Sequence, residues 1–347
     1  MTADTASSPR TRESWFERIP KVELHLHLEG AIPHHALWEL IQKYGGDPSI
    51  PDIPALERKF AYRDFPHFIQ VWTWKNQFLR EYEDFTFIAG AVAQDLARQN
   101  IRYAEIFFSP ADFRRHGLQT QRLAEAIRTG LSRVPQIDVA LVADLVRDFG
   151  PQRASLTLAE VNDVHELGVV GIGMGGSEPA FPPELFAKVY EEARRLGFHT
   201  TAHAGEAAGP ESIWGAIRSL QVERIGHGTR AEEDKALLDH LAEKRIPLEM
   251  CPISNVRTGV ESIEEHPARR YFDRGIVVTI NTDDPKMFGN SLAQEYRLLV
   301  EKLGFSRDDI RTVILQGIRS AWLPRDRKME LVEAFCSCSA WTEQTQV

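Results

Sequence analysis

The chain has 347 residues, of which 43% are hydrophobic and 26% are charged, a composition typical of a globular protein with a large core. Its formal net charge is −9 and no block rich in lysine or arginine occurs, which argues against a nucleic-acid or anionic-membrane surface. No stretch approaches the roughly 18 apolar residues of a membrane span. Three cysteines in so long a chain argue against a disulfide framework, and we expect a cytoplasmic protein.

Short apolar runs with strand-like composition alternate with longer segments of helical periodicity. The runs are 22–28, 101–109, 139–146, 169–176, 199–205, 223–228, 247–254 and 276–284. Helical spacing is clearest in 84–99, 120–133, 183–197 and 231–244. Eight strands alternating with helices predict an α/β fold with a parallel sheet, and their number favours one closed TIM-type (β/α)8 barrel. An open doubly wound sheet is the alternative, but no GxGxxG loop follows the first run.

Two stretches have the chemistry of helix starts, and one long segment follows the first predicted strand. In SPRTRES (8–14) and TLAE (157–160), Ser or Thr precedes an acidic residue. Residues 46–83 are longer than one barrel helix requires, and their aromatic residues include Phe60, Tyr62, Phe65, Phe68, Trp72, Trp74 and Phe78. Such spacing is typical of helical packing or of a pocket lid. We predict a helical insertion that covers the C-terminal mouth of the barrel, where both interpretations hold.

The first predicted strand carries two histidines in the sequence KVELHLHLEG (21–30). Because side chains alternate along a strand, His25 and His27 point to the same face. This pair alone is equally consistent with a metal site and with two hydrogen-bonded, half-buried histidines. Other predicted strand ends add further polar groups: HAGE (203–206), the GHG that contains His227, and NTDDP (281–285). Since such barrels keep their reactive groups at the C-terminal strand ends, these groups together predict a metal site.

We predict that one metal ion is bound by His25, His27, His203 and Asp283. Three neutral imidazoles and one carboxylate suit Zn²⁺, with iron or cobalt as substitutes. A position left for water would make the site catalytic, because a bound zinc ion lowers the pKa of water toward about 7. His227 is then free to orient that water and take its proton, and Glu206 to protonate the substrate. Cys336 and Cys338 lie in a polar tail without partner histidines, and we expect no metal there.

The motifs PKVELHLHLEGAI, HAGE, ERIGHG, CPISN and NTDDP, in this order, resemble the adenosine deaminase family of the amidohydrolase superfamily. The resemblance covers nearly the whole chain. It implies one zinc ion per chain and hydrolytic conversion of a 6-aminopurine nucleoside, adenosine or 2′-deoxyadenosine, to inosine and ammonia. Carried over by position, it implies zinc ligation by the four residues above, protonation of purine N1 by Glu206 and orientation of the hydroxide by His227. Asp284 would hydrogen-bond N7, and the Gly176 N–H would contact N3.

Two departures from this family affect the substrate. Glu29 stands where adenosine deaminases typically have an aspartate that reaches the ribose, and we assign Glu29 to substrate binding. GMGGSE (173–178) replaces a stretch resembling DLAGDE. HLEG also occurs in adenine deaminases and aminodeoxyfutalosine deaminases, so adenine and aminodeoxyfutalosine remain alternative substrates. A metal-dependent phosphoesterase is a more distant alternative, for which we would expect more histidines and a cationic phosphate clamp.

The polar composition of the two ends and the extent of the resemblance together predict the domain organisation. We expect a disordered leader over 1–14, a metal-dependent (β/α)8 deaminase domain over 15–335 and a polar tail over 336–347. The expected partner is a small-molecule purine, with neither nucleic acid nor membrane, and the sequence leaves the oligomeric state open.

Overall fold

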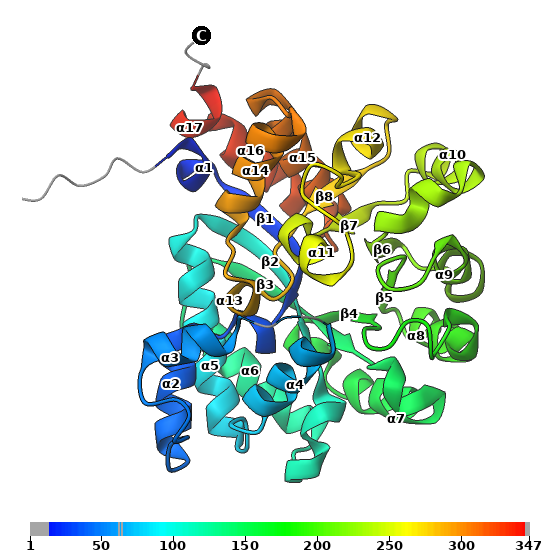
Figure 1. The fold of residues 1–347 in the computed structure, drawn as a ribbon. Coiled ribbons are helices and arrows are strands. Elements are labelled where there is room, and N and C mark those ends of the chain that lie inside the picture. Colours follow the sequence, from blue (N-terminus) through cyan, green and yellow to red (C-terminus); the bar gives the residue numbers. More distant parts are fainter. Residues whose placement is uncertain (1–13, 62, 64, 344–347) are drawn as a thin grey trace, which may run out of the picture.

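The computed structural model describes residues 14–343 except residues 62 and 64. Eight parallel strands form a barrel in which each strand pairs with the next along the chain (Figure 1). They are β1 (Lys21–His27), β2 (Ile101–Phe108), β3 (Asp138–Asp144), β4 (Val169–Gly173), β5 (His199–Ala204), β6 (Arg224–His227), β7 (Leu248–Met250) and β8 (Val278–Ile280). The barrel closes through a parallel bridge between Leu26 and Asp283. The predicted (β/α)8 barrel is confirmed.

Helices follow the strands and surround the barrel (Figure 1). The main ones are α5 (Tyr82–Arg98), α6 (Thr120–Leu131), α7 (Gly150–Asn162), α8 (Ala187–Arg195), α9 (Pro210–Gly215), α10 (Lys235–Lys244), α12 (Ala268–Asp273), α14 (Leu292–Leu303), α15 (Arg307–Ser320) and α16 (Arg325–Ser337). Their buried apolar faces pack on the strands and form one large core. Within the described part of the chain, we find no helix with the length and apolar character needed to cross a bilayer.

The four predicted helices are present, but two of them begin as 3-10 turns. These turns are Pro183–Phe186 before α8 and Thr229–Glu233 before α10. Helix α10 itself starts after Asp234, whose side chain accepts hydrogen bonds from two backbone N–H groups of the first helical turn. The 3-10 turns carry the same apolar spacing as the helices, so the sequence pattern does not separate them.

Some predicted boundaries are wrong. The runs 247–254 and 276–284 are strands only over β7 and β8. The first ends because Pro252, which has no N–H for the ladder, begins α11 (Pro252–Thr258). After β8 the Asn281 N–H still donates to the Met250 oxygen at 2.9 Å, but on the β1 side the Asn281 side-chain oxygen, in place of a backbone oxygen, accepts the Leu24 N–H at 2.8 Å. Both early endings place polar loop residues, rather than further strand, at the C-terminal mouth of the barrel.

The two predicted helix starts have different outcomes. TLAE is wrong as a start because residues 157–160 lie inside α7, where the apolar period of Ala154, Leu158 and Val161 continues through them. In SPRTRES only Ser14 is described, and residues 8–13 lie outside the described residues. Ser14 does precede a helix, α1 (Trp15–Arg18), and forms a capping box with Glu17.

The segment after β1 contains α2 (His34–Lys43), α3 (Ile53–Lys59) and α4 (Phe65–Asn76) before α5 begins. Helix α4 reaches the C-terminal mouth, where its Trp72 ring lies 6.3 Å from the ring of His27. Phe68 stacks on Phe288 of α13 (Pro285–Phe288) at a centroid distance of 5.4 Å. The aromatic residues therefore act both in packing and in covering the mouth. Residue 62 and the side chain of Phe65 lie outside the described residues.

Candidate metal centre and active site

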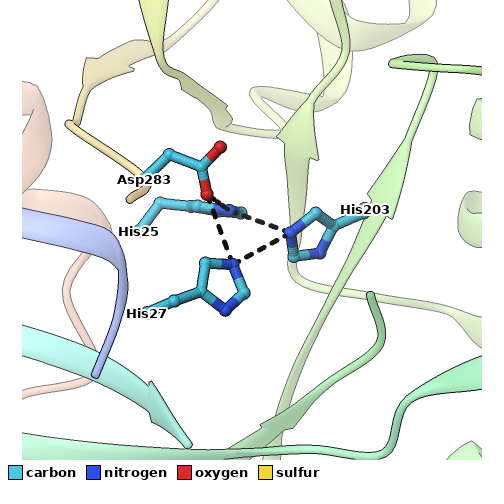
Figure 2. Close-up of side chains that lie close together, drawn as sticks. All are labelled: His25, His27, His203 and Asp283. Atoms are coloured by element: carbon cyan, nitrogen blue, oxygen red, sulfur yellow. Dashed lines mark hydrogen bonds and ion pairs between the residues drawn. The ribbon is translucent and has the colours of Figure 1, made fainter. Parts of the chain in front are cut away.

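Four predicted ligands converge at the C-terminal ends of three strands (Figure 2). His25 and His27 come from β1, His203 from β5, and Asp283 from the loop after β8. The Nε2 atom of His203 lies 3.1 Å from that of His25 and 3.2 Å from that of His27. Asp283 Oδ1 lies 3.3 Å from His27 Nε2 and 3.7 Å from His25 Nε2. All four side chains are buried.

This geometry fits a metal ion better than a hydrogen-bonded cluster. A tetrahedral zinc site with Zn–N distances of about 2.0–2.1 Å separates its ligand atoms by roughly 3.3 Å. The four separations observed here, 3.1, 3.2, 3.3 and 3.7 Å, lie around that value. Without a cation, three ring nitrogens and a carboxylate oxygen would face one another with few protons to share. The donor set therefore fits one metal ion held by His25, His27, His203 and Asp283.

The electrostatics of the pocket favour the protonation states that metal binding requires. Burial lowers the pKa of His25 and of His203 well below the ordinary value for histidine, so both rings are neutral. Burial opposes ionisation of Asp283, but the neighbouring histidines outweigh it and the pKa of Asp283 is lowered. Ser254 Oγ also donates to Asp283 Oδ2 at 2.6 Å. Neutral imidazoles and an ionised carboxylate are the forms that coordinate metals.

A buried ionic chain orients the first of these ligands from inside the barrel. Glu249 Oε2 on β7 lies 2.9 Å from His25 Nδ1, which leaves His25 Nε2 to face the centre. The other oxygen of Glu249 lies 2.6 Å from Arg224 Nε on β6, and Arg224 also pairs with Glu105 of β2. A carboxylate on the far nitrogen of a histidine ligand fixes its ring and raises its basicity. Glu249 is thus expected to support metal affinity without touching the metal.

Glu249→Gln is expected to weaken zinc binding by about 10- to 100-fold, because the ring of His25 loses its charged partner. Arg224 keeps its ion pair with Glu105, so we expect the variant to fold. The zinc dissociation constant is measured by competition with a chromogenic chelator. Glu243→Gln, at an exposed position of α10, is the matched control. An unchanged zinc affinity in the Glu249 variant would contradict this role.

His227, at the end of β6, has a defined orientation next to the centre. The Asn255 side-chain oxygen lies 3.2 Å from the Cys251 backbone nitrogen, which can only donate, so the orientation of this amide is fixed. The Asn255 Nδ2 group then donates to His227 Nδ1 at 3.0 Å. In the neutral ring the proton therefore lies on Nε2, which is 3.5 Å from Glu206 Oε2. His227 accordingly presents an N–H donor to the site.

Two carboxyl groups of the site are shifted toward their protonated forms. Burial raises the pKa of Glu206 above the ordinary value, although His227 opposes the shift. Burial, with the adjacent charge of Asp283, raises the pKa of Asp284 well above the ordinary value. Asp284 Oδ1 has no hydrogen-bond partner among the described residues. Both groups can therefore donate a proton or a hydrogen bond to a ligand.

Backbone strain occurs at two of these loops. His227 has φ 61° and Asp283 has φ 64°, in the left-handed region that residues other than glycine rarely occupy. Such conformations cost about 1–3 kcal/mol each and persist where the surrounding structure enforces them. Both residues lie at the C-terminal mouth of the barrel, His227 as the last residue of β6 and Asp283 in the loop after β8.

Glu29, which follows β1, lies under the insertion. Its Oε1 accepts the Ser109 N–H at 3.0 Å, while Oε2 has no hydrogen-bond partner among the described residues. Burial raises the pKa of Glu29 to about 7. Lys75 of α4 donates to the Glu29 backbone oxygen at 2.7 Å, and burial lowers the pKa of Lys75 to about 8. The unpartnered oxygen of Glu29 is available to a ligand that donates a hydrogen bond.

Gly176, in the loop after β4, has φ 100°, a conformation that favours glycine. A Cβ atom there would lie 2.0 Å from Asp148 Oδ2. The preceding residue, Gly175, donates its N–H to Asp144 Oδ1 at 2.8 Å and lies next to the His203 ring. The loop therefore runs alongside His203, one of the four candidate ligands, and its backbone is held by Asp144.

The sequence reasoning missed several residues that support the site. Glu249 had a usable signal, because a charged residue inside the apolar run 247–254 needs a buried partner. Ser254 and Asn255 belong to the CPISN motif, but the motif alone did not predict their hydrogen bonds to Asp283 and His227. Lys75 is a lone cation among the aromatic residues of WTWKN (72–76), and its contact with Glu29 is visible only in the folded chain.

Comparison with known proteins identifies the family of the chain. A profile of the family described as "Adenosine deaminase" matches residues 20–337. An aminodeoxyfutalosine deaminase of Streptomyces avermitilis is 34% identical, over 97% of this chain and 96% of its own. An adenine deaminase of Bordetella avium is 35% identical, over 89% and 98% of the two chains. An adenosine deaminase of Klebsiella pneumoniae (strain 342) is also 35% identical, over 91% and 97%.

Solved structures give the same result. An adenine deaminase of Arthrobacter aurescens superimposes with a TM-score of 0.85 at 30% identity, covering 91% of this chain and 98% of its own. An amidohydrolase of Burkholderia ambifaria with bound Zn gives 0.86 at 30% identity, covering 93% and 91%. Arabidopsis ADAL, solved with IMP, gives 0.84 at 26% identity, covering 93% and 98%. The chain belongs to the adenosine deaminase family of the amidohydrolase superfamily and is a hydrolytic deaminase.

Proposed function

We propose that the protein is a zinc-dependent deaminase that converts a 6-aminopurine nucleoside, adenosine or 2′-deoxyadenosine, to the 6-oxopurine and ammonia. The observation that carries the proposal is a buried three-histidine and one-aspartate centre beside a carboxyl group, Glu206, whose pKa is raised. Zinc is the proposed metal because its tetrahedral N and O coordination matches this donor set. The related Burkholderia ambifaria structure with bound Zn supports that choice.

The proposed chemistry divides between the metal and the protein. A bound zinc ion lowers the pKa of a coordinated water toward about 7 and so supplies the nucleophile. Attack at purine C6 requires the ring to accept electrons, which protonation of N1 allows. Glu206, whose pKa is raised by burial, donates that proton. His227 uses its Nε2–H to hold the attacking oxygen in line with C6, so we assign it orientation in place of the proton uptake expected from sequence.

Three further residues position the purine. Asp284, whose pKa burial and the charge of Asp283 raise well above the ordinary value, donates a hydrogen bond to the N7 lone pair. The Gly176 N–H donates to N3 from the opposite edge of the ring. Glu29 accepts a hydrogen bond at the N9 side through its unpartnered oxygen. Together these contacts fix the ring so that C6 faces the metal centre and N1 faces Glu206.

Adenine and aminodeoxyfutalosine are the alternative substrates. Glu29 favours them, because it stands where adenosine deaminases typically have an aspartate, and relatives at 34–35% identity include deaminases of both kinds. The test is an ultraviolet assay of adenosine, 2′-deoxyadenosine, adenine and aminodeoxyfutalosine side by side with the purified, zinc-loaded protein. The proposal expects the highest kcat/KM with adenosine or 2′-deoxyadenosine. A strong preference for one of the other two would identify the alternative, and no turnover of any of the four would overturn the proposal.

Gly30→Ala is expected to lower kcat/KM by about tenfold or more with the zinc content unchanged. A Cβ atom at Gly30 would lie 1.7 Å from Asp284 Oδ1 and 2.5 Å from its Cγ, so the carboxyl group must move away from N7. Steady-state kinetics and metal analysis measure the effect. Gly259→Ala is the control, because a Cβ there meets only one atom, at 3.8 Å. Equal activity of both variants would remove Asp284 from the proposed contact.

A further inference from the structure

Glu178 has no place in the chemistry above, yet its carboxylate binds the segment that carries Glu206. The side chain is 3% exposed. Its Oε1 accepts the Gly205 N–H at 2.5 Å, and Oε2 accepts the N–H groups of Glu206, Ala207 and Ala208 at 3.2, 2.8 and 3.0 Å. One buried carboxylate thus receives four consecutive backbone amides. Charge-assisted bonds of this kind are stronger than neutral ones.

Apart from Glu178, the segment 205–208 is held at its first residue, where the Gly205 oxygen accepts the Arg230 N–H at 3.0 Å and the Thr229 hydroxyl at 2.9 Å. It follows β5 directly and belongs to neither a strand nor a helix, so its amides have no ladder or helix partners. The side chain of Glu206 makes only a distant contact with His227, at 3.5 Å, and a hydrogen bond with Thr258. The direction of the Glu206 side chain therefore depends on the backbone conformation that Glu178 imposes.

Glu178 is itself held by the loop after β4. The neighbouring Ser177 N–H donates to Asp148 Oδ2 at 2.8 Å, and Gly175 N–H donates to Asp144 Oδ1 at 2.8 Å. Gly176, which we assign to N3 of the purine, lies two residues before Glu178 in the same loop. The chain thus links the loops after β3, β4 and β5 by carboxylates that accept backbone N–H groups. Through Glu178, the loop after β4, which contains Gly176, is hydrogen-bonded to the segment after β5, which contains Glu206.

We propose that Glu178 is a positioning residue that fixes the carboxyl group of Glu206 at the place from which it protonates the substrate. The inference rests on the proposed function, in which Glu206 is the proton donor. Glu178 touches neither metal nor substrate and acts only through the 205–208 segment. A residue of this kind affects the rate of the chemical step more than the binding of the substrate.

The test is a double-mutant cycle between Glu178 and Glu206 in the zinc-loaded protein. Glu178→Gln keeps the size of the side chain but replaces one acceptor oxygen with an NH₂ group that faces backbone donors. We expect kcat to fall by roughly 10- to 100-fold while KM changes by less than about threefold. In the Glu206→Gln background, the same change should cost less than about threefold further, because the group it positions is already lost.

The controls separate positioning from folding. Glu184→Gln, at an exposed site of the 3-10 turn Pro183–Phe186 that follows this loop, should leave kcat and KM unchanged. Zinc content and thermal unfolding are measured for every variant, and Glu178→Asp replaces the Gln variant if that one does not fold. The shorter carboxylate of the Asp variant cannot reach all four amides, so it should also lower kcat in the presence of Glu206 and not in its absence.

The possible outcomes are distinct. Loss of kcat that largely disappears in the Glu206→Gln background supports the positioning role. An equal loss in both backgrounds indicates a purely structural anchor and overturns the inference, as does a variant with wild-type kcat. Wild-type protein that deaminates none of the four purines would overturn the proposed function and this inference with it, and that result is visible before any variant is compared.

Discussion

Asp283→Ala is expected to abolish deamination, with kcat lowered by about four orders of magnitude or to the detection limit. Asp283 is the only carboxylate among the four converging ligands, and its removal leaves three neutral imidazoles around a divalent cation. Loss of the anionic ligand weakens metal binding, and the nucleophile at neutral pH is lost with the metal. The measurements are zinc per chain by atomic absorption and initial rates in the ultraviolet assay.

The backbone at Asp283 requires a second variant. Alanine is strained at φ 64°, and residue 283 also closes the barrel through its bridge with Leu26. Asparagine tolerates this conformation and keeps the shape of the side chain while removing its charge. We expect Asp283→Asn to fold and still to lose most of its zinc and its activity. The exposed Asp239→Ala on α10 is the matched control.

Chelation provides the same test without a substitution. Removal of the metal should abolish turnover, and zinc should restore it to the wild-type protein but not to the Asp283 variants. Full activity after the metal has been removed and verified to be absent would contradict the metal assignment. Adding cobalt or iron to the metal-free protein and measuring whether turnover returns would show which metals the ligand set accepts.

The barrel and its ligand positions were predictable because two regular features coincide in this chain. Strand and helix periods alternate eight times, and parallel strands bring their C-terminal ends to one rim. His25, His27, His203 and Asp283 each lie at the end of a predicted run, so topology alone places them together. The order of the strands and helices therefore predicts which residues meet at this rim, without any knowledge of side-chain packing.

The support of the site was not predictable in the same way. Glu249 and His25 are 224 residues apart, and their contact depends on the relative register of β7 and β1, which β8 separates in the closed barrel. The proton position on His227 depends on Asn255, which is oriented by a backbone N–H of a third residue. These contacts follow from packing geometry, which one-dimensional periodicity does not encode. The same holds for the early ends of two strands. After β7 a helix begins at Pro252, and after β8 the Asn281 side chain takes the Leu24 N–H that a backbone oxygen would otherwise accept.

The structure also changes what the glycines of two motifs mean. In HLEG, Gly30 stands where any Cβ would meet Asp284, so this glycine serves a residue that is 254 positions away. In GMGGSE, Gly176 adopts a left-handed conformation next to Asp148. Both positions are determined by the close approach of a carboxylate rather than by a turn alone. A side chain at either position would collide with that carboxylate, which explains the glycine next to Glu29 in HLEG and the glycine two residues before Glu178 in GMGGSE.

Glu206→Gln should lower kcat by about three orders of magnitude while zinc stays bound. Glutamine fills the same space and cannot transfer a proton to N1, and Glu206 is not among the four converging ligands. General acid catalysis contributes typically 10²–10⁴-fold, which sets the expected size of the loss. KM should change little, because the contacts at N3 and N7 remain. Initial rates and zinc content, measured on the same preparation, give both quantities.

The pH dependence separates the acid role from a binding role. Wild-type kcat should fall as pH rises through the raised pKa of Glu206, because the proton to be donated is lost above it. The Gln variant has no such proton, so its residual rate should lack this alkaline limb. Glu233→Gln, an exposed carboxylate whose loss should leave the rate and its pH profile unchanged, is the control. A Glu206→Gln protein with wild-type kcat, or one that has lost its zinc, would contradict the assignment of Glu206 as the proton donor.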